Sequence, residues 1–176
     1  MPSTLILGGV RSGKTRLAER LAQESGLAVT WIATALAGDE EMAGRIAAHR
    51  AHRPAHWGLI EEPVALARTL RTQAAPRRCL VVDCLTLWLT NLLTLPGLGP
   101  GRLARERADL LAALPGLPGE LVLVANETNL GVIPLGELSR RFCDEAGALH
   151  QDLARACDRV VMTVAGLPLT LKGPPL

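Results

Sequence analysis

The chain of 176 residues has few aromatic side chains: three tryptophans, one phenylalanine and no tyrosine. Hydrophobic residues nevertheless make up 48% of the sequence, which argues against a disordered chain and leaves aliphatic side chains to fill the core. Such a core is typical of α/β proteins, whose parallel strands are buried on both faces. The length suits one domain with a substantial core, and we expect residues 1–176 to form a single domain.

An excess of charge of one sign is also lacking, because 19 basic and 17 acidic residues give a net charge of +2. The basic residues are spread along the chain, so the sequence predicts binding neither to nucleic acid nor to a membrane surface. Lysine occurs only at Lys14 and Lys172, and every other basic residue is arginine. A lysine at position 14 therefore stands out.

Paired cysteines and long apolar runs are missing as well. The four cysteines have no C-x-x-C spacing and are expected to be free thiols, with no catalytic role: Cys79, Cys84, Cys143 and Cys157. The start MPSTLILGG is too short and uncharged for a secretory signal, and no apolar run reaches transmembrane length. We expect a cytoplasmic protein without a membrane span.

Apolar runs typical of strands alternate with amphipathic stretches typical of helices. Strands are expected at residues 4–9, 28–35, 79–84, 120–126, 159–166 and 167–172. Helices are expected at residues 14–25, 39–52, 102–114 and 138–156, with Pro54 ending the second. This alternation predicts an α/β fold with a mainly parallel sheet and helices on both faces.

A phosphate-binding loop follows the first expected strand and opens the first expected helix. The run GGVRSGKT matches G-x-x-x-x-G-K-[ST], and its expected nucleotide-binding residues are Gly8, Gly9, Val10, Arg11, Ser12, Gly13, Lys14 and Thr15. Its glycines let successive N–H groups turn toward phosphate oxygens, beside the positive end of a helix. We expect Lys14 to reach the β- and γ-phosphates and Thr15 to hold Mg²⁺.

A second metal ligand is expected at the end of a strand next to the P-loop strand. Asp83 closes the apolar run LVVD and is the candidate for this Walker B position. A plain turn-forming aspartate is the alternative. Together, loop and carboxylate predict a P-loop fold that binds a nucleotide with Mg²⁺.

The segment RIAAHRAHRPAHW, residues 45–57, contains three of the four histidines: His49, His52 and His56. Arginines are interleaved at Arg50 and Arg53, and they would repel a divalent cation. No Cys, Asp or Glu in the segment completes a ligand set. A metal site is therefore disfavoured.

Two other functions of this segment stay open beside a plain solvated helix end. His49 and Arg53 share a helical face, and Arg50 and Arg53 can bind phosphate in bidentate fashion. Neighbouring arginines also keep the His49 imidazole neutral, and a neutral imidazole can attack phosphorus. His49 is thus a candidate nucleophile in a chain that binds a nucleotide.

The sequence resembles one family along its whole length. The matching runs, in order, are LGGVRSGKT, WIATA, DEEMAGRIAAHRAHRPAHWGLIEEP, VVDCLTLWLTNLL, VANE, GVIP and VAGLPLTLK. These runs are similar to the bifunctional adenosylcobinamide kinase / adenosylcobinamide-phosphate guanylyltransferase family of cobalamin biosynthesis. The resemblance implies a RecA-like P-loop fold and a homotrimer.

The resemblance also implies two reactions. The first phosphorylates adenosylcobinamide with ATP or GTP. The second transfers GMP from GTP to adenosylcobinamide phosphate through a histidine, which corresponds to His49 here, and yields adenosylcobinamide-GDP and pyrophosphate. Besides the P-loop, the implied nucleotide contacts are Ala33, Thr34, Ala35, Arg50, Ala51, His52, Arg53, Glu61 and Asp83. Either Glu61 or Glu62 would orient the imidazole or hold the guanine or ribose.

Several positions depart from the family pattern. Asn129 stands in NETNLG where glycine is usual, Cys143 and His150 replace Arg and Asn, and Trp31 replaces Tyr. Asparagine tolerates a left-handed backbone, so the turn at position 129 can persist. The changes at positions 129, 143 and 150 bear on corrinoid or subunit contacts, and Trp31 is a modest change. Two other functions remain open: a P-loop kinase for another small molecule, and a nucleotide-gated binding module.

Overall fold

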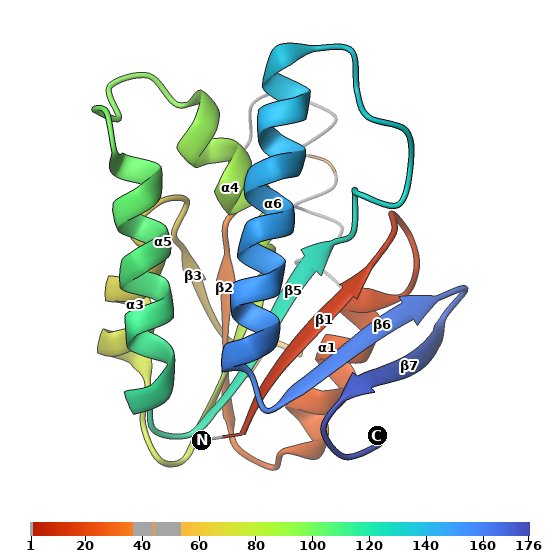
Figure 1. The fold of residues 1–176 in the computed structure, drawn as a ribbon. Helices are drawn as coiled ribbons and strands as arrows, with labels where there is room; N and C mark the ends of the chain where they lie inside the picture. The colour runs from red at the N-terminus through yellow and green to blue at the C-terminus, as the bar shows by residue number, and fades with distance from the viewer. Residues whose placement is uncertain (1, 37–43, 45–53) are drawn as a thin grey trace.

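The computed structural model describes residues 2–36, 44 and 54–176. Seven strands form one sheet in the order β3-β2-β4-β5-β1-β6-β7 (Figure 1). The strands are β1 (Ser3–Gly8), β2 (Ala28–Ala33), β3 (Gly58–Glu61), β4 (Arg78–Asp83), β5 (Glu120–Asn126), β6 (Arg159–Val164) and β7 (Leu167–Lys172). All neighbouring strands run parallel except β7, which is antiparallel to β6.

Helices cover both faces of this sheet (Figure 1). They are α1 (Lys14–Glu24), α3 (Leu66–Gln73), α4 (Leu85–Thr94), α5 (Arg102–Ala113) and α6 (Glu137–Ala156), with a 3₁₀ turn at Leu114–Gly116. Helix α1 lies on one face, while α3, α4, α5 and α6 lie on the other. The predicted fold, a mainly parallel sheet covered on both faces, is confirmed.

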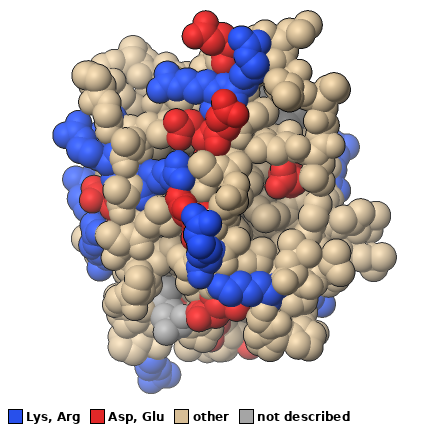
Figure 2. Space-filling view, viewed as in Figure 1, with Lys and Arg blue, Asp and Glu red and all other residues tan. Residues whose placement is uncertain are grey.

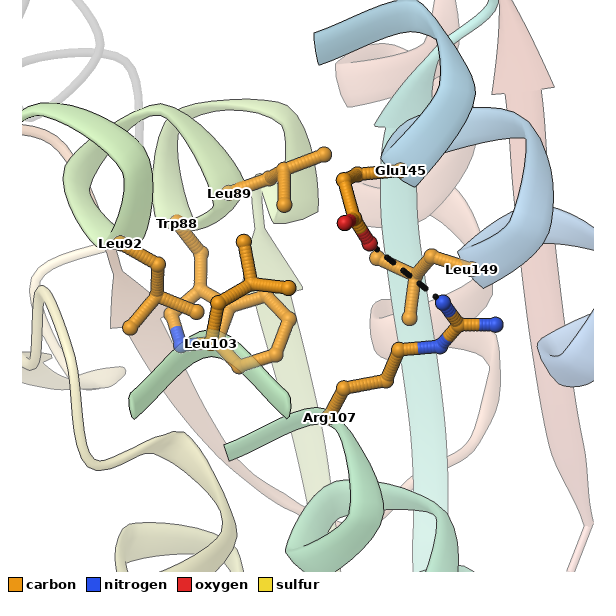
Figure 3. Close-up of a pocket in the computed structure, with 7 residues that line it drawn as sticks. All are labelled: Trp88, Leu89, Leu92, Leu103, Arg107, Glu145 and Leu149. Carbon is orange, nitrogen blue, oxygen red and sulfur yellow. Dashed lines mark ion pairs between the residues drawn. The ribbon is translucent and has the colours of Figure 1, made fainter. Parts of the chain in front are cut away.

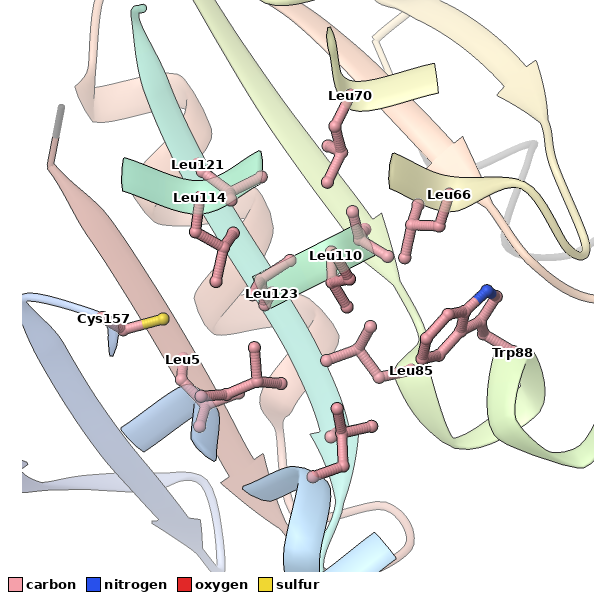
Figure 4. Packing of buried hydrophobic residues seen from close by; sticks show 14 of the residues in the cluster. Leu5, Leu66, Leu70, Leu85, Trp88, Leu110, Leu114, Leu121, Leu123 and Cys157 are labelled. Atoms are coloured by element: carbon pink, nitrogen blue, oxygen red, sulfur yellow. The ribbon is translucent and has the colours of Figure 1, made fainter. Parts of the chain in front are cut away.

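The core forms two clusters, one for each face of the sheet. Side chains alternate along each strand, so Leu121 and Leu123 of β5 pack with α4, α5 and α6, whereas Val122 and Val124 pack with α1. The larger cluster consists almost entirely of leucine and other aliphatic residues around Trp88 (Figure 4). This agrees with the aliphatic core expected from the sequence.

Polar contacts join the helices on the outer face. Arg107 of α5 lies 3.5 Å from Glu145 of α6, beside apolar side chains such as Leu89 of α4 (Figure 3). Arg107 also pairs with Asp152, and the Trp88 Nε1–H donates to the Val64 carbonyl at 2.8 Å. Basic and acidic side chains are accordingly interspersed on this face (Figure 2).

The expected strands and helices are found within a few residues of their predicted ends, but three elements were missed. Strand β3, helix α3 and helix α4 had no counterpart in the prediction. The helix expected at residues 39–52 lies outside the described residues apart from Gly44. None of the described helices is long and apolar enough to cross a membrane.

The expected place of Asp83 was wrong in one respect. Asp83 ends β4, and β5 lies between β4 and the P-loop strand β1. Strand order depends on pairing between distant segments, which no local pattern encodes. The carboxyl ends of β1, β5 and β4 nevertheless meet at one edge of the sheet, so Asp83 stays on the side of the P-loop.

Candidate nucleotide-binding site

Residues 8–15 join the carboxyl end of β1 to the amino end of α1. Gly8 has φ 154° and Gly13, the N-cap of α1, has φ 101°, a region that disfavours residues with a Cβ. Val10 is 78% exposed and Arg11, at φ 55°, is also exposed at the crest of the loop. A glycine-rich turn that leads into a helix N-terminus presents backbone N–H groups to an anion.

Lys14 lies inside this loop. Its side chain is buried, and Nζ donates to the Gly9 carbonyl at 2.6 Å and lies 3.5 Å from the Ser12 Oγ. Burial lowers the pKa of Lys14, and the nearby Cys84 thiol and Asp83 carboxylate oppose this shift. The interaction with Asp83 indicates that the expected phosphate ligand and the expected metal ligand face one site.

The β6–β7 hairpin holds the P-loop from the side. Ser12 Oγ and Thr163 Oγ1 lie 2.7 Å apart, and the Thr163 hydroxyl also donates to the Leu7 carbonyl at 3.3 Å. The Gly166 N–H donates to the Ser12 carbonyl at 2.9 Å. A Cβ on Gly8 would come within 2.4 Å of Thr163 Oγ1, so the loop and the hairpin pack without spare room.

Asp83 is held by a threonine that the sequence assigned to nucleotide contact. The Thr34 hydroxyl is buried; it donates to the Cys84 carbonyl at 2.7 Å and accepts from the Cys84 N–H at 3.0 Å. The Thr34 N–H donates to the Asp83 carbonyl at 3.3 Å. These contacts fix the chain directly after the Asp83 side chain. A direct nucleotide contact by Ala33, Thr34 or Ala35 stays a prediction.

The structure separates the roles of Glu61 and Glu62. The Glu62 carboxylate accepts the N–H groups of Val64 and Ala65 at 2.9 and 2.7 Å, and the Thr69 hydroxyl at 3.1 Å. It therefore caps the start of α3. Glu61 is exposed at the carboxyl end of β3, where it pairs with Ala33. Glu62 is thus engaged by the start of α3, whereas a ligand contact by the exposed Glu61 stays a prediction.

Comparison with known proteins identifies the family of this chain. A family model described as cobinamide kinase / cobinamide phosphate guanyltransferase matches residues 4–171. The chain belongs to this family. It is 67% identical to the bifunctional adenosylcobalamin biosynthesis protein CobP of Pseudomonas aeruginosa, over 98% of both chains.

More distant relatives extend the comparison. The bifunctional adenosylcobalamin biosynthesis protein CobU of Escherichia coli is 37% identical over 96% of this chain and 98% of its own length. A solved structure from Pyrococcus horikoshii OT3 aligns with a TM-score of 0.59 at 9% identity, over 99% of this chain and 87% of the other, and supports the fold alone. The protein is therefore an enzyme of the cobinamide kinase / guanyltransferase family with a P-loop NTPase fold, as predicted.

Thr15 and Asp83 offer the oxygen ligands that Mg²⁺ prefers. Thr15 follows Lys14 at the start of α1 and is half-buried, and Asp83 is half-buried at the end of β4. No group of three or more His, Cys, Asp or Glu side chains that could hold a metal occurs among the described residues. Mg²⁺ commonly takes only one or two protein ligands and completes its shell with phosphate and water, so the residues present fit it.

Three of the four departures from the family pattern, those at positions 129, 143 and 150, gather in one place. The Asn129 N–H donates to the Glu127 carboxylate at 2.7 Å, and the Asn129 side chain donates to the Cys143 carbonyl at 2.9 Å. The other Glu127 oxygen lies 3.6 Å from Nδ1 of the buried His150. Asn129, Cys143 and His150 therefore form a single cluster around Glu127 at the carboxyl end of β5.

The histidine segment is only partly described. His49, Arg50, Ala51, His52 and Arg53 lie outside the described residues, so their expected roles stay predictions. His56 is exposed. Beyond it, Trp57 stacks on the buried Trp31 of β2, with ring centroids 5.9 Å apart. This stack anchors the chain where it enters β3.

Proposed function

We propose that the chain phosphorylates adenosylcobinamide with ATP or GTP and then transfers GMP from GTP to the product, as the resemblance implies. The observation that carries the proposal is the buried Lys14 inside a P-loop, where its Nζ donates to the Gly9 carbonyl at 2.6 Å, with Asp83 at the same edge of the sheet. Family membership and the names of the relatives support both activities. Each reaction leaves charge on phosphate oxygens, which such a site can stabilise.

In the kinase reaction, the hydroxyl oxygen of the aminopropanol group attacks the γ-phosphorus of the nucleotide and its proton is released to water. The bond from γ-phosphorus to the bridging oxygen breaks, and the nucleoside diphosphate leaves. Lys14 and the N–H groups of residues 8–15 stabilise the charge on the phosphate oxygens. Bound Mg²⁺, held by Thr15 and Asp83, would add positive charge at the same oxygens.

In the transfer reaction, a neutral His49 nitrogen attacks the α-phosphorus of GTP, and pyrophosphate leaves. An oxygen of adenosylcobinamide phosphate then attacks the guanylyl phosphorus, the phosphorus–nitrogen bond breaks, and adenosylcobinamide-GDP is released. Arg50 and Arg53 would bind phosphate oxygens, with Ala51 and His52 between them, and Glu61 would contact His49 or the nucleoside. We further propose a cytoplasmic homotrimer.

A phosphorylation assay with adenosylcobinamide and γ-labelled ATP or GTP tests the kinase activity. We expect Lys14→Ala to lose at least about 100-fold in rate, because the transferring phosphate loses its main cationic partner. Lys172→Ala is the matched control. The Lys172 ammonium donates to carbonyls at the end of α6, away from the P-loop.

The control should lower the thermal midpoint but keep the rate within about threefold, because it removes a helix-end contact only. A near-normal rate for Lys14→Ala would show that the P-loop assignment is wrong. No phosphorylation by the wild type, with nucleotide bound, would favour a kinase for another small molecule.

A further inference from the structure

Asn126 occupies a position at the nucleotide site that neither the P-loop motif nor the Walker B position describes. It ends β5, the strand between the P-loop strand β1 and the Asp83 strand β4. In the parallel register Asn126 pairs with Gly8, the first residue of the P-loop, while Asp83 pairs with Val124. Asn126 therefore lies between the two halves of the site.

The side-chain alternation places Asn126 on the same face as Asp83. Val122 and Val124 of β5 pack in the cluster that contains Leu17 and Ala18 of α1, and so do Cys79 and Val81 of β4. Because successive side chains along a strand point to opposite faces, the next residues on this face are Asn126 and Asp83. This is the face of the sheet covered by the P-loop helix.

The neighbouring residue Glu127 has the opposite orientation. Leu123 and Ala125 belong to the cluster on the α6 face, and Glu127 continues this series. Its carboxylate accepts the Asn129 N–H and faces His150 of α6. The side chains of residues 126 and 127 therefore lie on opposite faces of the sheet. A substitution at Glu127 can serve as the control for substitutions at Asn126.

Hydrogen bonds hold the backbone around Asn126 in place, while its side-chain amide can still bind a ligand. The Asn126 N–H donates to the Thr86 hydroxyl at 2.7 Å, and the Glu127 N–H donates to the Gly8 carbonyl at 2.9 Å. The side chain is half-buried, and within residues 2–36, 44 and 54–176 its amide makes no hydrogen bond. Water can satisfy such a half-buried amide in the absence of a ligand, so its side-chain N–H can be given to a bound phosphate at little cost.

Strand geometry puts this amide within reach of a ligand shared with Lys14 and Asp83. Adjacent strands lie about 4.8 Å apart and rise about 3.3 Å per residue, so the Cα atoms of Asn126 and Asp83 are about 8 Å apart. Side chains of this length can contact one phosphoryl group from two sides. The loop residues preceding Lys14 begin at Gly8, the partner of Asn126 in the sheet.

We propose that Asn126 is a further catalytic residue, whose side-chain N–H donates a hydrogen bond to the terminal phosphoryl group of the nucleotide as it is transferred. The inference rests on the proposed kinase activity. No proton is transferred; the amide stays neutral and stabilises the negative charge on the oxygens of the moving group. Such a donor raises kcat when its hydrogen bond is stronger in the transition state than in the bound nucleotide.

The test compares Asn126→Ala and Asn126→Asp with Glu127→Gln in the phosphorylation of adenosylcobinamide. We expect Asn126→Ala to lower kcat about 100-fold and to change the KM for nucleotide less than threefold, because one transition-state donor is lost. Asn126→Asp should lower kcat at least as much, because its carboxylate repels the phosphate. Glu127→Gln should keep kcat within about threefold, since its side chain lies on the other face. A kcat of either Asn126 variant within threefold of wild type overturns the proposal, and so does an equal loss in Glu127→Gln.

A second measurement tests the proposed role of Asn126 even if the protein phosphorylates no corrinoid. ADP together with magnesium and aluminium fluoride imitates the phosphoryl group during transfer, and its affinity can be measured by calorimetry. Asn126→Ala should weaken this complex at least about tenfold while the affinity for ADP alone is unchanged. Equal losses of affinity for ADP alone and for the ADP–aluminium fluoride complex would mean that Asn126 has only a structural role. A wild type that binds both but phosphorylates no adenosylcobinamide would instead contradict the proposed function alone.

Discussion

At the scale of single residues, the P-loop depends on side chains outside its motif. Lys14 approaches the Ser12 hydroxyl, Ser12 contacts Thr163, and Thr163 donates to the Leu7 carbonyl. All three side chains are buried, so each polar group needs its partner. Thr163 thereby fixes Ser12 beside Lys14, the residue that we expect to contact the phosphates.

Removal of the Thr163 hydroxyl should loosen the loop. In Thr163→Val the Ser12 hydroxyl and the Leu7 carbonyl lose a partner, at a cost of about 1–3 kcal/mol, while valine still suits a strand. We expect the KM for nucleotide to rise about tenfold, a change of about 1.4 kcal/mol in binding. Steady-state kinetics of Thr163→Val and Thr163→Ser test this expectation. The serine variant keeps the hydroxyl and should have the KM of wild type. A valine variant that also has the wild-type KM would refute the role of Thr163.

Three of the four cysteines have buried side chains and are expected to be unreactive. Burial raises the pKa of Cys79, Cys84 and Cys157 to about 11. At pH 7.5 fewer than about one in a thousand such thiols is ionised, so alkylation in the native protein should be at least about 100-fold slower than in urea. Mass spectrometry of iodoacetamide-treated protein measures both rates at each cysteine. Comparable rates in the two states would contradict the burial of these thiols.

At the scale of the elements, helix α6 carries a pH-sensitive contact. Burial lowers the pKa of His150, and the Glu127 carboxylate opposes the shift. The folded state therefore binds fewer protons at His150 than the unfolded chain does. Stability from this residue is complete above about pH 6.5 and is lost as the pH falls through the lowered pKa.

Replacement of His150 should make the free energy of unfolding less dependent on pH. Between pH 7.5 and 5.5 we expect the free energy of unfolding of wild type to fall more than that of His150→Asn. Urea titrations at the two pH values measure the difference, and the histidines at positions 49, 52 and 56 are common to both proteins. An identical fall in both proteins would mean that His150 binds protons equally in the folded and unfolded states.

Helices and strands whose apolar residues recur with a clear period could be predicted from the sequence, and the other elements could not. Strand β5 and strand β7 have the predicted ends, and α1, α5 and α6 end within one residue of theirs. Helix α4 has apolar residues on nearly every side, because it packs between α5, α6 and the sheet; such a run shows no helical period. Strand β3 has four residues, too few for a pattern.

At the scale of the whole molecule, the site is a product of the strand order. The P-loop and Asp83 were recognisable because their signals are local in sequence. Thr163 lies 151 residues from Ser12, and Asn126 meets Gly8 only through sheet pairing. The run VANE contains Asn126, but no local pattern indicates the neighbours of Asn126 or Thr163. These contacts form only when β5 and β6 flank β1.

The most direct test of the central claim concerns the carrier of GMP. The protein is incubated with Mg²⁺ and GTP labelled at the α-phosphate, denatured, and examined for bound label, with His49→Ala as the variant and His56→Ala as its control. The account predicts an acid-labile, base-stable label on wild type and on His56→Ala, and none on His49→Ala. Absence of label on wild type with GTP bound, or label that persists in His49→Ala, would contradict it.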